Sequence, residues 1–195
     1  MSIGQVRIAT APIAVLVAAL VVVSGCDDAG DDAGEGEVVR AEVQSTPDGT
    51  LETHEIVPST PTAEGLAYMQ AVAAIHRDAD AQSGEAQVAT LQRGLELAVP
   101  AGLPEAEVLR LELASRIAAV WLESARADPT GPARAKDLLA PMLEPSRSVP
   151  LDRASAEALV LLGDAATRTG DDALAAGTYA RSIRMMSILR QELER

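Results

Sequence analysis

The side chains that most often carry out catalysis are scarce in this chain of 195 residues. It has one cysteine (Cys26), two histidines (His54 and His76) and one lysine (Lys136). One cysteine and two histidines cannot supply the four ligands of a structural zinc site. The sequence also lacks the Gly-x-Ser-x-Gly, Gly-Lys-Ser/Thr and His-Glu-x-x-His motifs of serine hydrolases, phosphate-binding loops and metalloproteases. We therefore predict no enzyme activity, no metal and no cofactor.

The carboxylate pairs and one histidine fall where structural roles are favoured. Glu105 with Glu107, and Asp171 with Asp172, lie in the first turns of expected helices, where negative charge complements the helix dipole. Glycosidase chemistry needs two carboxyl groups that face one sugar across a cleft, and neighbours at a helix start do not face each other. His76 lies near the end of an expected helix, where it complements the negative pole.

Three further candidates are also expected to be structural. Lys136 lies on the polar face of an expected amphipathic helix, so we predict a solvated side chain rather than a Schiff-base nucleophile. His54 is expected on an exposed strand. Trp121 and the pair Met185 and Met186 are apolar enough to anchor a partner, but we expect them to fill the core.

The charge balance excludes one class of partner. Acidic residues number 29 and basic residues 16, which gives a formal net charge of −13. A nucleic-acid binder carries a basic stripe, and this chain has the opposite excess. Aromatic residues make up only 2% of the chain, too few for a platform on which bases stack. We predict no nucleic-acid partner.

The first 25 residues have the composition of a secretory signal. Arg7 and the free amine form a short basic region, and an unbroken apolar run follows over 13–23. This run has 11 residues, whereas a helix that spans a bilayer needs about 20. The segment 1–25 therefore predicts a cleaved signal peptide rather than a permanent anchor.

The end of this segment, Val23-Ser24-Gly25-Cys26, resembles the lipobox of bacterial lipoproteins. The only cysteine of the chain stands where that motif requires one, and Val23 takes the place of the more common Leu. The resemblance implies cleavage between Gly25 and Cys26, lipidation of the Cys26 thiol, and acylation of the new amine. Two or three acyl chains would hold the protein on a membrane stably. The implied location is the bacterial cell envelope, with the leaflet left open.

Residues 26–60 predict an acidic flexible tether. Ten acidic residues and one Arg over 27–60 give a net charge of −9, and the first eleven of these residues include no large apolar side chain. A hairpin is predicted within the tether, over 38–57, because apolar and polar residues alternate on both sides of Thr46-Pro47-Asp48-Gly49. An isolated hairpin is only marginally stable in water, so this one either docks on the domain or fluctuates.

The remainder, residues 61–195, predicts an all-α domain. This part of the chain is rich in Ala, and every break contains Gly or Pro, which end helices. Thr60-Pro61 is the expected cap of the first helix. Short connections predict antiparallel helix pairs. The six expected helices cover residues 62–82, 85–98, 104–127, 132–144, 152–169 and 171–193.

The last pair resembles a tetratricopeptide (TPR) repeat, a helix-turn-helix unit of 34 residues. The matching positions are Leu162 and Gly163 in its first helix, the turn Gly170–Asp171, and Ala175 and Tyr179 in its second helix. Gly163 and Ala175 lack bulk where the two helices would cross, and Tyr179 would fill the space beneath them. The two earlier pairs share the outline without this signature, and their spacings of about 47 and 39 residues are irregular.

The resemblance implies helix pairs stacked as a TPR-like right-handed superhelix with a groove for partner peptides. A closed six-helix bundle, which has no groove, is the alternative. The expected function is a membrane-tethered envelope lipoprotein that acts as a protein–protein interaction scaffold, with an unknown envelope protein as its partner. The alternative function is an envelope enzyme or small-ligand-binding helical protein without a recognisable motif.

Overall fold

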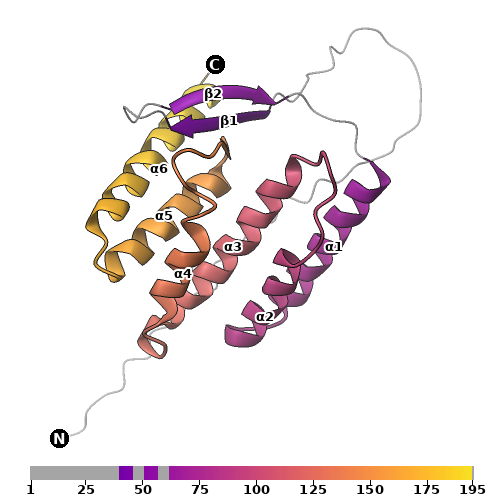
Figure 1. The fold of residues 1–195 in the computed structure, drawn as a ribbon, viewed down its shortest axis with the longest axis vertical. Coiled ribbons are helices and arrows are strands. Elements are labelled where there is room, and N and C mark those ends of the chain that lie inside the picture. Colours follow the sequence, from indigo (N-terminus) through magenta and orange to yellow (C-terminus); the bar gives the residue numbers. More distant parts are fainter. Residues whose placement is uncertain (1–39, 46–50, 57–61, 195) are drawn as a thin grey trace, which may run out of the picture. The chain divides into compact units, whose positions relative to one another are not determined.

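The computed structural model of the protein describes residues 40–45, 51–56 and 62–194. The predicted signal peptide, Gly25, Cys26 and most of the predicted tether lie outside these residues. Figure 1 shows the elements, which are β1 (Arg40–Ser45), β2 (Leu51–Ile56), α1 (Ala63–Asp80), α2 (Gly84–Leu95), α3 (Glu105–Glu123), the 3-10 turn η1 (Ser124–Arg126), α4 (Gly131–Leu139), β3 (Val149–Pro150), α5 (Arg153–Arg168) and α6 (Asp172–Leu193).

The fold is mostly helical, as predicted, and the six described helices correspond to the six expected ones. Side chains cap three of them. Thr62 accepts a hydrogen bond from the Gly65 amide at the start of α1, so Thr62 rather than Thr60 is the N-cap. Asp152 caps α5 in the same way. Asp171 is the N-cap of α6 and accepts from the Leu174 amide, whereas the sequence placed it one step later, in the first turn.

The helix ends follow backbone chemistry. The helix α4 stops at Leu139, five residues before its predicted end, because Pro141 has no amide hydrogen and its ring clashes with the preceding turn. The helix α3 ends at Glu123 and tightens into η1 instead of continuing to residue 127. Between α5 and α6, Gly170 has φ +77°, the left-handed conformation that glycine adopts at helix C-termini.

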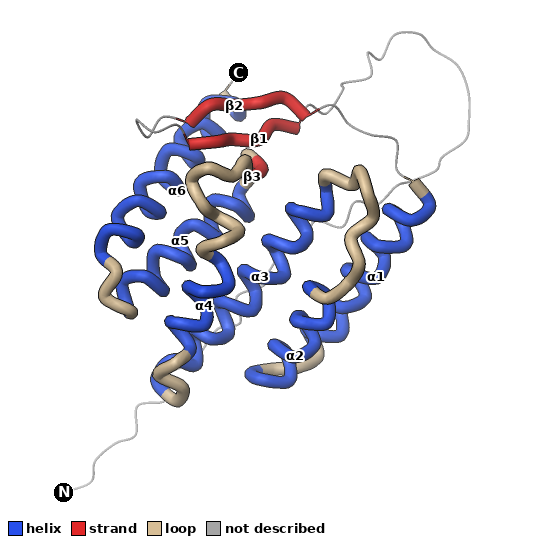
Figure 2. The backbone as a smooth tube through the Cα atoms, viewed as in Figure 1, coloured by secondary structure: helices blue, strands red, loops and turns tan. Residues whose placement is uncertain are grey.

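Each helix contacts the next one along the chain, which the short connections predicted (Figures 1 and 2). In addition, α1 contacts α3 and α3 contacts α5. The odd-numbered helices therefore form a row of neighbours. Within the described ranges, no helix combines the length and the apolar character needed to cross a bilayer.

A small antiparallel sheet is the exception to an all-α fold (Figure 2). β1 and β2 pair with Ser45 opposite Leu51, as a hairpin would, and residues 46–50 between them lie outside the described residues. β1 also pairs with β3, with Val43 opposite Val149. The sequence predicted only a helix break over 145–150, and it predicted the hairpin as part of the tether. In the structure, the hairpin is joined to the helical region by hydrogen bonds.

The core is continuous between the helices and the sheet. Fully buried Leu and Ile side chains from α2, α3, α4, α5 and the connection between α4 and β3 form its centre, and Val43 of β1 and Val149 of β3 belong to the same cluster. Docking therefore buries apolar surface that the isolated hairpin would leave in water. The buried side chains at the centre of the cluster are Leu91, Leu113, Ile117, Leu139, Leu143, Leu159 and Leu162.

Candidate functional site

The residues that carry the resemblance to a repeat meet where α5 crosses α6. A Cβ atom built on Gly163 would lie 2.6 Å from Cε1 of Tyr179, and its three nearest neighbours all belong to that ring. Such a distance is too short for any real side chain. Leu162, Gly163 and Ala175 are buried at this interface. The glycine thus permits a close approach between the α5 backbone and the Tyr179 ring.

The Tyr179 ring is only half-buried, although the sequence predicted that it would fill the space beneath the crossing. Its hydroxyl group donates a hydrogen bond to Oδ1 of Asp164, at 2.5 Å. This bond to a carboxylate is the main reason why the pKa of Tyr179 is raised. The ring therefore links α6 to α5 by packing on Gly163 and by hydrogen bonding to the next residue.

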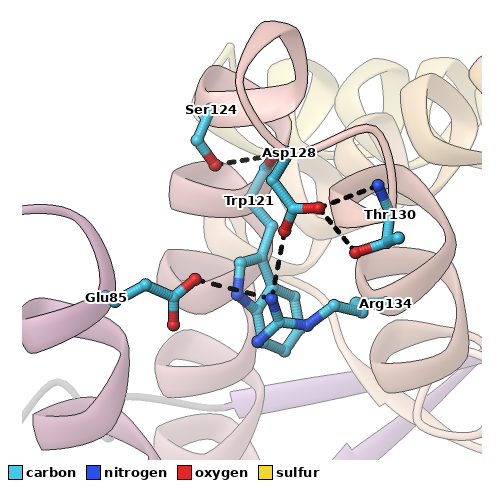
Figure 3. Close-up of polar contacts among 6 residues, drawn as sticks. All are labelled: Glu85, Trp121, Ser124, Asp128, Thr130 and Arg134. Atoms are coloured by element: carbon cyan, nitrogen blue, oxygen red, sulfur yellow. Dashed lines mark hydrogen bonds and ion pairs between the residues drawn. The ribbon is translucent and has the colours of Figure 1, made fainter.

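A polar cluster joins α2, α3 and α4 (Figure 3). The Arg134 guanidinium carbon lies 4.2 Å from the centroid of the Trp121 ring, within the range of a cation–π interaction. The same guanidinium lies 3.4 Å from Glu85 and 3.3 Å from Asp128. Trp121 is only 5% exposed, as predicted for a core residue. Arg134 therefore covers the tryptophan and links three helices.

The start of α4 is held against α3 beside this cluster. Asp128 accepts hydrogen bonds from the amide and hydroxyl groups of Thr130, which hold the pKa of Asp128 below its usual value. A Cβ atom on Gly131 would lie 2.4 Å from the carbonyl oxygen of Trp121, so no larger residue fits there. The carboxylate is occupied by structural bonds, and its arrangement does not resemble that of a general acid or base.

His76 joins α1 to α3. Its Nδ1 lies 2.6 Å from Nη1 of Arg116, and Arg116 also pairs with Asp80. Arginine donates only, so Nδ1 is the acceptor and the proton of the neutral ring is on Nε2. Nε2 is buried without a hydrogen-bond partner in the described part of the chain. Burial is the main cause of the lowered pKa of His76. The helix-end role predicted for this residue is therefore replaced by a link between two helices.

A shallow apolar depression lies between α1 and the α2–α3 connection. It has a volume of about 490 Å³, and small apolar side chains form most of its wall. Tyr68 is a buried lining residue, and burial raises the pKa of Tyr68, an effect that Arg110 partly offsets. Val99, one of its lining residues, is 43% exposed. The lining residues are Glu64, Ala67, Tyr68, Ala71 and residues 97–101.

The other candidates from the sequence are dispersed. Lys136 lies 3.5 Å from Asp171 and connects α4 to the α6 cap, rather than being fully solvated. Glu107 pairs with Arg147 at 3.4 Å. Met185 is buried as predicted, whereas Met186 is 45% exposed, so the expectation that both fill the core is wrong for Met186.

His54 is on β2, and its side chain lies outside the described part of the structure, as do Gly25 and Cys26. Among the described residues, no group of three or more His, Cys, Asp or Glu side chains could hold a metal ion. Sequence reasoning missed the contacts of Asp164 with Tyr179, Arg134 with Trp121 and Arg116 with His76 because each pair is 13 or more residues apart along the chain.

Comparison with known proteins adds no relative: no family model, curated protein or solved structure matches the chain. Inferences about function therefore depend on the sequence motifs and on the geometry described above.

Proposed function

We propose that the protein is a membrane-tethered lipoprotein of the bacterial envelope that acts as a protein–protein interaction scaffold through a TPR-like helical domain. The lipobox Val23-Ser24-Gly25-Cys26 supports the tether, because the sole cysteine occupies the position that lipidation requires. The acidic residues that follow, over 27–37, would be repelled by anionic lipids and so hold the domain away from the surface.

The row formed by α1, α3 and α5 is the observation that carries the scaffold proposal. In arrays of helical hairpins, each repeat contacts its neighbours in sequence, and equivalent helices line one face. The first helices of the three pairs have this relationship here. The close contact between Gly163 and Tyr179 supports a TPR-like crossing in the last pair.

The apolar depression beside α1 is the surface that we assign to partner binding. Its wall is made of alanines, Val99 and Pro100, so a partner would bury apolar side chains there. Val99 is a large apolar lining residue that is 43% exposed to water in the isolated chain. A catalytic pocket would instead bring carboxylates with strongly shifted pKa values together, and Glu64 is the only acidic residue among those that line the depression.

The tether is tested by replacing Cys26 with Ser in the full chain. Wild-type protein should incorporate a fatty-acid probe, lose residues 1–25 and fractionate with membranes. The Cys26→Ser variant should stay unprocessed and unlabelled. Normal processing and labelling of this variant would refute the lipoprotein assignment.

The scaffold is tested separately by site-specific photo-crosslinking in cells. A crosslinking amino acid at Ala71, in the depression, should give discrete adducts that Ala67→Glu and Val99→Glu, both at lining residues, abolish. The same amino acid at Ala173, an exposed position on α6, is the matched control. Equal adducts from both positions, or adducts that both Glu variants leave intact, would contradict binding at the depression.

A further inference from the structure

Arg181, near the middle of α6, is an unusual cation. It is 7% exposed, and no other charged side chain in the described ranges is buried to this degree. Its Nη1 donates a hydrogen bond to the carbonyl oxygen of Leu143, at 2.5 Å. Leu143 lies between α4 and β3 and is itself fully buried.

The two other nitrogens of the guanidinium, Nε and Nη2, are buried and have no hydrogen-bond partner among the residues that the structure describes. These two atoms form one edge of the planar group, and their N–H bonds point in the same direction. That edge is the fork that binds the two oxygens of a carboxylate side by side. The bond to Leu143 uses the other end of the group, so the whole fork is left unused.

No carboxylate within the described residues compensates this charge. The ion pairs of the described chain use other cations, and burial alone lowers the pKa of Arg181. Three other arginines show the contrast: Arg116 and Arg134 pair with acids, and Arg168 bonds to a carbonyl oxygen while remaining exposed. A buried cation without a counter-charge is strongly unfavourable, so the fork is suited to an anion.

A second unpartnered polar group lies at the same end of the α5–α6 interface. Ser182, next to Arg181, donates a hydrogen bond to the carbonyl oxygen of Ala156 at 2.9 Å. Ser155, next to Ala156, is 1% exposed, and its hydroxyl group has no hydrogen-bond partner within the described ranges. Two buried donors without acceptors therefore occur at adjoining positions of the two helices.

We propose that the Nε–Nη2 fork of Arg181 is a binding site for one carboxylate group. A carboxylate carries a single negative charge and two coplanar oxygens, which match the single positive charge and the fork. A dianionic phosphate would leave one negative charge uncompensated in a buried place. Both nitrogens are shielded from water, so the carboxylate enters when the neighbouring chain opens. The residues that follow Leu143, over 144–148, are exposed throughout, and this segment would have to move.

The test follows the Nε–Hε resonance of Arg181 by NMR in the full chain, held in detergent micelles, while sodium formate replaces sodium chloride at constant ionic strength. We expect a saturable downfield shift of the Arg181 Hε signal. The exposed side chain of Arg153 provides the internal control, and its signal should change little and without saturation. Sodium phosphate at the same ionic strength should not reproduce the saturable shift.

Thermal unfolding gives a second readout. Formate should raise the melting temperature of wild type relative to chloride, and Arg181→Lys, which keeps the charge but lacks the fork, should lose this increment. The wild-type titration decides the matter even if the variant does not fold. An Arg181 signal that does not move, that follows Arg153, or that saturates with phosphate instead would overturn the proposal.

Discussion

The backbone of Gly163 lies against the ring of Tyr179, and no side chain at position 163 could share that space with the ring. A Cβ atom there would be 2.6 to 2.9 Å from three ring atoms. Gly163 lies inside α5, where alanine is the better helix former, so helix propensity alone would favour Gly163→Ala. The clash with the Tyr179 ring acts in the opposite direction, and the two effects on stability can therefore be separated.

Gly163→Ala should destabilise the wild-type protein and stabilise the Tyr179→Ala variant. In wild type, the added methyl group pushes the ring away, which costs about 1–3 kcal/mol and outweighs the gain of about 1 kcal/mol in helix propensity. Without the ring, only that gain remains. Unfolding of the two single variants and the double variant measures the coupling. A Gly163→Ala effect of the same sign in both backgrounds would contradict the close contact.

The stability contributed by His76 should depend on pH. Its pKa is lowered in the folded protein, chiefly by burial, whereas in the unfolded chain it is about 6.5. As the pH falls through 6.5, the unfolded state takes up the proton first, so the free energy of unfolding decreases until the folded protein is protonated too. Above pH 7.5 both states hold a neutral ring, and this contribution is constant.

The measurement compares wild type with His76→Gln between pH 7.5 and pH 5 by chemical denaturation. Glu112, Asp80 and Arg116, which influence this histidine, are the same in both proteins. Wild type should lose stability relative to the variant as the pH falls. Parallel stability curves over this range would show that the buried ring does not control the α1–α3 contact.

Arg134→Met should expose the only tryptophan of the chain to quencher. Arg134 covers the Trp121 ring and pairs with Glu85 and Asp128, so its loss should cost about 1 kcal/mol. We expect greater quenching of Trp121 fluorescence by acrylamide and a red-shifted emission. Arg153→Met removes an exposed pair with Glu157 and should change neither signal. Equal quenching in the two variants would contradict the stacking.

Val43→Ala should destabilise the helical domain, although Val43 is on the hairpin. The side chain is 0% exposed and belongs to the main core, so the loss of two methyl groups should cost about 2 kcal/mol. Glu52→Ala, on the exposed part of β2, is the control and should have little effect. The readout is the single unfolding transition followed by helical circular dichroism. A harmless Val43→Ala would show that the hairpin does not stabilise the helices.

The sequence alone determined the helices and the segments between them. These features depend on interactions within about four residues: Asp152 caps the amide of Ser155, Gly170 adopts the left-handed conformation, and Pro141 ends α4. The hairpin strands could be predicted for the same reason, from alternation along each strand. The effect of Pro141 is also local, so the sequence contains the information that ends α4 before residue 144.

The tertiary structure decided which of these elements meet and what their side chains contact. Ser148 donates a hydrogen bond to Glu42, 106 residues earlier in the chain, at 2.7 Å, and β3 is extended because it pairs with β1. The burial of Arg181 and the contact of His76 with Arg116 likewise arise only when separate helices pack. Local sequence sets backbone conformation, but a partner 30 to 100 residues away is chosen by the joint packing of all the elements, which no single segment encodes.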